Sequence, residues 1–173
     1  APTAIDTTWL SERRAGKKSL KARGGQGTEQ ALANALDWLV RHQSPDGRWS
    51  CAQFALNCGK LSKTPCDGAG DDALDGAGMH HPLHDVGVTG LALLALLGDG
   101  NTLNEGPYHE AVAKATRWLI SMQTTKEDHP GLLGRAFGNN FHYSHAMATQ
   151  ALCEVCACSR SAAVTRCAEQ AVK

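Results

Sequence analysis

An internal repeat constrains the fold of this chain more than any other feature of its sequence. The residues VTGLALL at 88–94 align with ATQALCE at 148–154, an offset of 60, and at the same offset EAV at 110–112 aligns with QAV at 170–172. Each copy is a strongly apolar helical pattern followed by an amphipathic one. Such a repeat predicts helical hairpins that stack on one another and bury a continuous core between them.

Helical periodicity extends over most of the chain, and no segment alternates as a strand would. Residues 29–43 predict an amphipathic helix. Residues 86–97 are apolar almost all round, so we expect a helix that is buried on every side, with Gly98 just after its end. Three further helices are expected after Pro107, over about 143–157, and after Ser161. The predicted fold class is all-α.

Charge divides the chain into a basic arm and a helical domain. The first 27 residues are predicted to form a solvated, glycine-rich arm or linker, and residues 28–173 the domain. The whole chain carries 17 basic and 17 acidic residues, a net charge of zero, which argues against nucleic acid as a partner. It has no apolar run of about 20 residues and therefore no expected transmembrane segment. We expect a soluble domain, in a compartment that the sequence does not identify.

Residues 44–84 predict a long loop rich in glycine, cysteine and aspartate, and loops of that length are often functional. Cys51, Cys58 and Cys66 lie in it. Neither they nor the four C-terminal cysteines show the paired CxxC spacing of a structural zinc site. Together with His80 or His84, the three loop cysteines could nevertheless bind a metal such as zinc and pin the loop.

A short motif follows the first predicted helix, in the stretch RHQSPDGRWS at 41–50. It places Gln43, Gly47 and Trp49 directly behind the helix end. A glutamine amide can bond to the free carbonyl groups at a helix end, and an indole can be buried while its N–H stays paired. A second copy carries Gln123 but has Leu133 in place of the tryptophan. We predict that the motif is a structural clasp between hairpins.

This pattern is similar to the QW motif of squalene and oxidosqualene cyclases, with related repeats in protein prenyltransferase β-subunits. Over about residues 24–173 the chain resembles uncharacterised bacterial proteins with prenyltransferase/squalene-oxidase-type repeats, through GGQGTEQALANALDWL, TGLALLALLGDG and HAMATQALCE. The resemblance implies an α/α toroid with inner and outer helices around a central cavity. This chain would hold about two and a half hairpins of it. The resemblance also implies a glutamine amide stacked on the tryptophan.

The catalytic motifs that the resemblance implies are missing. No DxDD acid motif is present, and the Asp/Cys/His zinc set of protein prenyltransferases has no match. The string DDALD, at 71–75, has the letters of a DDxxD magnesium motif. Because glycines flank it closely, it has room for barely a helical turn, and an acidic loop is the simpler interpretation. We predict no catalytic residue.

Two polar groups lie where the two most apolar helices are expected to start. His84 and Asp85 precede the first, and His142, Tyr143 and His145 begin the second. At the repeat offset Asp85 aligns with His145. In the resembled toroids this end of the inner helices carries the substrate pocket. These residues are therefore candidates for a ligand-binding rim, with N-capping by Asp85 or Ser144 and ordinary surface positions as the simpler alternatives.

Three functions remain open. The leading hypothesis is a toroid module without catalytic motifs that binds a partner protein or an apolar, isoprenoid-like ligand. The second is part of a terpenoid cyclase or prenyltransferase-like enzyme whose catalytic repeats lie outside this chain. The third is a helical array pinned by metal. A partial toroid would expose the flanks of its buried helices, so we also expect self-association or a partner protein that completes the ring.

Overall fold

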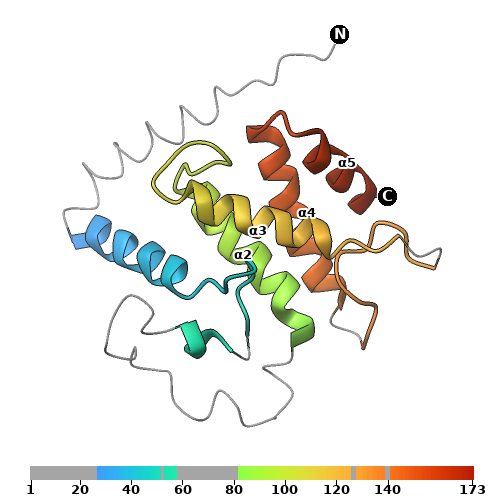
Figure 1. Ribbon diagram of the computed structural model, residues 1–173, viewed down its shortest axis with the longest axis horizontal. Helices are drawn as coiled ribbons and strands as arrows, with labels where there is room; N and C mark the ends of the chain where they lie inside the picture. The colour runs from blue at the N-terminus through green and yellow to red at the C-terminus, as the bar shows by residue number, and fades with distance from the viewer. Residues whose placement is uncertain (1–26, 52, 58–81, 126–127, 139–140) are drawn as a thin grey trace.

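The computed structural model describes residues 27–51, 53–57, 82–125, 128–138 and 141–173 (Figure 1). Within these ranges the chain is helical and forms no strand, apart from one isolated antiparallel bridge between Gln123 and Leu133. The predicted all-α class is therefore confirmed for the described residues. The predicted basic arm and most of the predicted 44–84 loop lie outside them.

The helices follow the expected order along the chain. Residues 27–41 form the N-terminal helix, followed by two short 3-10 helices, η1 (Phe54–Asn57) and η3 (Pro82–His84). The remaining helices are α2 (Asp85–Gly98), α3 (His109–Ser121), α4 (Phe141–Cys158) and α5 (Ala162–Ala171). The predicted cap at Ser161 is present, because its side chain accepts a hydrogen bond from the backbone N–H of Val164.

Helices α2 and α4 pack against each other in the middle of the molecule (Figure 1). Helix α3 packs on α2, α5 packs on α4, and the N-terminal helix lies on the opposite side of the molecule from α5. The apolar stripes of these helices meet in one core, whose fully buried members include Leu93, Leu96, Val112, Leu119 and Leu152. The apolar helices α2 and α4 are thus inner helices, and the amphipathic α3 and α5 cover them.

Small residues allow α2 and α4 to approach closely. A Cβ atom on Gly87 would lie 3.0 Å from the Cα atom of Ser144, and one on Gly90 would lie 2.8 Å from the backbone nitrogen of Ala148. Real Cβ atoms essentially never come closer than 3.0 Å, so the contact at Gly90 requires glycine. A Cβ atom on Gly87 would be at that limit and would push Ser144 away. The GVTG stretch therefore sets the distance between the two inner helices.

Two predictions about α2 are wrong. The helix is not buried on every side, because Leu91 is 50% exposed, Val88 is 36% exposed and Ala95 is also exposed. The described N-terminal helix and α4 cover only part of its circumference. Gly98 does not follow the helix but is its last residue, and Gly100 is the glycine that takes the positive φ, 91°, which ends it.

None of the described helices is both long enough and apolar enough to cross a membrane.

Candidate functional site

The first clasp, residues 43–49, joins the end of the N-terminal helix to α3. The Nε2 group of Gln43 donates to the carbonyl oxygen of Gly47 at 2.9 Å and to that of Ala111 in α3 at 3.0 Å. The backbone N–H of Ser44 donates to the carbonyl of Arg48, and that of Gly47 donates back to Ser44. One amide thus holds the turn closed and fixes it to a helix that lies 68 residues away in sequence.

Trp49 completes this clasp with two further hydrogen bonds. Its indole Nε1–H donates to the carbonyl of Leu39 at 2.7 Å, and its backbone N–H donates to the hydroxyl of Thr89 in α2 at 2.9 Å. The indole, rather than the amide of Gln43, therefore satisfies a carbonyl at the helix end. The ring is buried in the core, so Trp49 ties the N-terminal helix to the inner helix α2.

The second clasp, residues 123–133, repeats this hydrogen-bond pattern. The Nε2 group of Gln123 donates to the carbonyl of Gly131 at 3.1 Å and to that of Cys167 in α5 at 2.8 Å. The backbone N–H of Thr124 donates to Leu132, and that of Gly131 donates to Thr124. Gln43 and Gln123 thus bond in the same way, each to the glycine carbonyl of its own turn and to a distant helix, although the second turn is four residues longer.

The two clasps correct the repeat offset that the sequence suggested. Ala111 accepts from Gln43 as Cys167 accepts from Gln123. In the same way, Thr89 accepts from the backbone N–H of Trp49, and His145 from that of Leu133. Both pairs are 56 residues apart, not 60. The counterpart of His145 is therefore Thr89 rather than Asp85, and the two predicted rim groups do not occupy equivalent positions.

His145 is a scaffold residue in this arrangement. Its Nδ1 atom accepts from the N–H of Leu133 at 3.1 Å, so the ring proton is on Nε2, which donates to the carbonyl of Ala171 in α5 at 3.1 Å. Burial lowers the pKa of the imidazole, the carbonyl of Ala171 opposes this effect, and nearby His142 adds to it. Both ring nitrogens are thus engaged, which favours the neutral form.

This geometry predicts a loss of stability in mild acid. Because the pKa of His145 is lower in the folded chain than its ordinary value of about 6.5, stability should fall as the pH decreases from about 6.5 toward the folded-state pKa. In His145→Gln, whose side chain can accept and donate but does not titrate, we expect the free energy of unfolding to change less over this interval. Urea denaturation between about pH 7.5 and 5.5 measures the difference.

The exposed His129 supplies the control for this experiment. His129→Gln should keep the pH dependence of the parent chain. If His145→Gln and the parent lose equal stability over the interval, the neutral scaffold role of His145 is wrong.

Asp85 fixes the loop that follows the first clasp. Its buried carboxylate accepts from the backbone N–H of Cys51 at 2.8 Å and from the Cys51 thiol at 3.1 Å, and it forms an ion pair with Nε of Arg48 at 3.4 Å. The suggested N-cap role of Asp85 is wrong, because the N-cap residue of α2 is His84 and no side chain caps that helix. Ser144 is no cap either, since it lies within α4.

The thiol of Cys51 donates a hydrogen bond to the carboxylate of Asp85 in this structure. Burial, followed by the hydrogen bond and the negative charge of Asp85, raises the pKa of its thiol to about 12. The thiol is therefore protonated at neutral pH. Among the described residues no group of three His, Cys, Asp or Glu side chains could hold a metal ion. The other predicted loop ligands, Cys58, Cys66 and His80, and the DDALD string lie outside the described residues.

The predicted rim residues lie at the N-terminal ends of α2 and α4. His84 is half-buried in η3, whereas His142 and Tyr143 are exposed on the first turn of α4. The ring of His142 packs against Phe141, with the ring centroids 3.8 Å apart. Two of the five predicted rim residues bond within the protein, Asp85 to Cys51 and His145 to Leu133 and Ala171.

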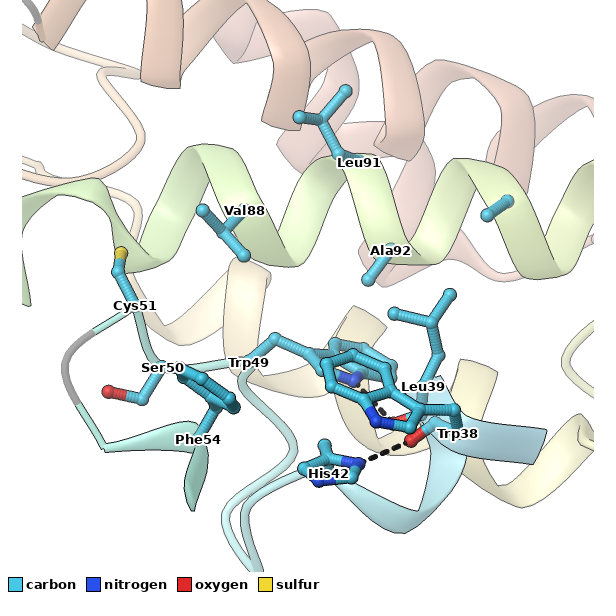
Figure 2. Close-up of a pocket in the computed structure, with 11 residues that line it drawn as sticks. Trp38, Leu39, His42, Trp49, Ser50, Cys51, Phe54, Val88, Leu91 and Ala92 are labelled. Atoms are coloured by element: carbon cyan, nitrogen blue, oxygen red, sulfur yellow. Dashed lines mark hydrogen bonds between the residues drawn. The ribbon is translucent and has the colours of Figure 1, made fainter. Parts of the chain in front are cut away.

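A pocket that the sequence did not predict lies between the N-terminal helix and α2 (Figure 2). Its volume is about 340 Å³. The lining is mostly aromatic and aliphatic: Trp38, Leu39, His42, Trp49, Ser50, Cys51, Phe54, Val88, Leu91, Ala92 and Ala95. These residues come from the helix, the first clasp, η1 and α2, so only the folded chain brings them together.

Polar groups in the pocket lining are bonded within the protein. The indole of Trp49 donates to Leu39, and the thiol of Cys51 donates to Asp85. The hydroxyl of Ser50 accepts from the backbone N–H of Gln53, and Nδ1 of the buried His42 bonds to the carbonyl of Trp38. A buried polar ligand group would lose its bonds to water without replacement, so the pocket suits an apolar group.

Models of known protein families, curated proteins and solved structures were compared with the chain, and none of them matches.

Proposed function

We propose that this chain is a binding module of the α/α-toroid type, which holds an apolar group of a partner protein in the pocket between the N-terminal helix and α2. The alternation of inner apolar and outer amphipathic helices supports the toroid geometry. The two clasps with one hydrogen-bond pattern support the likeness to the QW-motif family of squalene cyclases and prenyltransferases. The pocket is the observation that carries the proposal.

The pocket leaves large apolar side chains in contact with water. Trp38, Val88 and Leu91 are all exposed in part, and all three belong to its lining. Covering a side chain of this size completely contributes about 1.5–3 kcal/mol, so an apolar occupant that covers several of them in part gains a comparable free energy. A contiguous apolar hollow of this kind is typical of a binding surface.

A small apolar ligand, such as an isoprenoid, is the second candidate. The volume favours it, because about 340 Å³ lies at the lower end of the roughly 300–1,000 Å³ range of ligand pockets. The aromatic rings of Trp38, Trp49 and Phe54 would provide flat contact surfaces for it.

A neutral naphthalene-type fluorescent probe tests whether the pocket takes an apolar group. We expect saturable binding at one site per chain, with affinity at least about tenfold lower in Val88→Glu, because a carboxylate in an apolar pocket is poorly solvated. Farnesol should displace the probe if the second candidate is correct. The measurement is a fluorescence titration at submicromolar protein.

Phe137→Ala serves as the control, because Phe137 is an exposed aromatic residue that does not line the pocket. This variant should bind the probe like the parent chain. Equal binding to the parent and to Val88→Glu, or binding without saturation, would show that the pocket is not the site.

A further inference from the structure

We infer that the protein partner of this pocket is a second copy of the chain, which inserts its helix α4 beside α2 in a head-to-tail contact. This inference rests on the proposed function and names the partner. It follows from a comparison of the pocket with the same place in the second repeat, where the structure shows what fills it.

Two walls of the pocket, the first clasp and α2, have counterparts in the second repeat. In the clasps, Trp49 and Ser50 correspond to Leu133 and Gly134, as the matched hydrogen bonds show. On the inner helices the 56-residue offset pairs the pocket residues of α2 with residues of α4. Val88, Leu91, Ala92 and Ala95 correspond in this order to Ser144, Met147, Ala148 and Ala151.

In the second repeat these counterparts are covered by α2 itself. Gly87 lies against Ser144, and Gly90 lies against Met147 and Ala148. The second clasp takes part too, since a Cβ atom on Gly134 would meet the side chain of Val86 at 3.2 Å. Where the first repeat has a pocket, the second repeat therefore holds an inner helix.

Burial shows the same difference between the repeats. Ser144 is 8% exposed and Ala148 is fully buried, whereas Val88, the counterpart of Ser144, is 36% exposed. Ala151 is buried and its counterpart Ala95 is exposed. The exposed flank of α2 is thus a helix-packing surface whose neighbouring inner helix is absent from the described chain.

The complementary surface is on α4. The residues of α2 that pack against the second repeat are Val86, Gly87 and Gly90. At the 56-residue offset, their counterparts on α4 are His142, Tyr143 and Ala146. All three counterparts are exposed, Tyr143 to 69%. The helix α4 thus presents to solvent the face that α2 uses for packing.

The composition of this face is unusual for a surface helix. The exposed residues of α4, here called the α4 face, include no charged side chain: His142, Tyr143, Ala146, Gln150, Cys153 and Ala157. The exposed residues of the outer helix α3, in contrast, include Glu110, Lys114 and Arg117. Charged residues are thus present on α3, which faces water, and absent from the α4 face, where the repeat predicts a neighbouring helix.

The pocket also explains how a second copy could place a tyrosine where the second repeat has a glycine. Its occupant from a second copy would place Tyr143 where the second repeat has Gly87. A glycine leaves no space between helices, whereas a tyrosine ring needs a hollow. The pocket supplies about 340 Å³ at that place, beside Val88.

Because the pocket and the α4 face are different surfaces, the contact is heterologous, and each copy keeps one free surface of each kind. Such a contact can be tested by mixing two variants that are each blocked on one surface. Val88→Glu blocks the pocket, and Ala146→Glu blocks the α4 face. Both residues are exposed, so both variants should fold.

We expect the parent chain to self-associate as its concentration rises into the micromolar range, and each variant alone to stay monomeric. An equimolar mixture should form heterodimers, because the intact α4 face of Val88→Glu meets the intact pocket of Ala146→Glu. These dimers should not grow further, since their two remaining surfaces are both blocked. Native mass spectrometry, with one variant labelled with ¹⁵N, counts the species.

Arg117→Glu, on the exposed face of α3, is the control for added negative charge and should associate like the parent. A monomeric parent chain, or association that neither variant affects, would overturn the inference. A mixture that remains monomeric although the parent associates would also overturn it. Probe binding by a monomeric parent would leave the proposed binding function intact and reject only the second copy as partner.

Discussion

Replacing Gly90 by leucine is expected to lower the free energy of unfolding by about 4 kcal/mol or more. A Cβ atom at this position would already lie 2.8 Å from the backbone nitrogen of Ala148 and 2.9 Å from its Cα atom. These atoms belong to the middle of α4 and cannot rotate away as the end of a side chain can. The two inner helices would have to separate, which opens the core around Leu93 and Leu152.

Such a loss is large beside the roughly 5–15 kcal/mol that stabilises a typical domain. Thermal or urea unfolding followed by circular dichroism measures it. Gly98→Ala is the matched control, since nothing lies within 4 Å of the position where its Cβ atom would be. That control should be neutral or stabilising by up to about 1 kcal/mol, because alanine favours a helix over glycine. A Gly90→Leu variant as stable as this control would disprove the close contact of α2 and α4.

The helices could be predicted from the sequence because their periodicity is a local property. The amphipathic stripes of α3 and α5 and the cap at Ser161 lie within a few residues of one another in the chain. The order of Gln43, Gly47 and Trp49 behind a helix end is local too, and it singled out the residues of the first clasp. Their partners could not be predicted, because the sequence suggested the amide of Gln43 for the helix-end carbonyl that the indole of Trp49 bonds.

The repeat offset could not be predicted, because the inner helices are built from recurring small and aliphatic residues. A shift by four residues, about one helical turn, returns a helix to nearly the same face and aligns alanine and leucine almost as well. The hydrogen bonds that the two clasps make to the other helices distinguish 56 from 60. The 60-residue offset paired His145 with Asp85, whereas the hydrogen bonds pair it with Thr89.

The pocket and the role of Asp85 depend on contacts between distant parts of the chain. Asp85 and Cys51 are 34 residues apart, and a carboxylate before an apolar helix predicts an N-cap rather than a loop anchor. The exposed flank of α2 was unexpected because an apolar helix pattern predicts burial on all sides. The described neighbours of α2 leave Val88 and Leu91 exposed, and periodicity alone does not show which face of an apolar helix stays uncovered.

Gly47→Ala tests the first clasp and should cost about 3 kcal/mol or more. Gly47 has φ 104°, where an alanine is strained, and its Cβ atom would overlap the carbonyl oxygen of Lys114 in α3. Gly138→Ala is the control without a close contact. Gly138 also has a positive φ, 62°, but nothing lies within 4 Å of its Cβ position, so its replacement should cost only about 1–2 kcal/mol.

The difference between these two variants therefore measures the contact of the clasp with α3 together with the greater backbone strain at φ 104°. Urea unfolding at neutral pH gives both values. Because the clasp also holds Trp49 beside the pocket, Gly47→Ala should weaken binding of the naphthalene-type probe, whereas Gly138→Ala should not. If the two variants lose equal stability and bind the probe equally well, the clasp does not position the pocket. The exposed flank of α2 would then have to form without help from the Gln-turn-Trp motif.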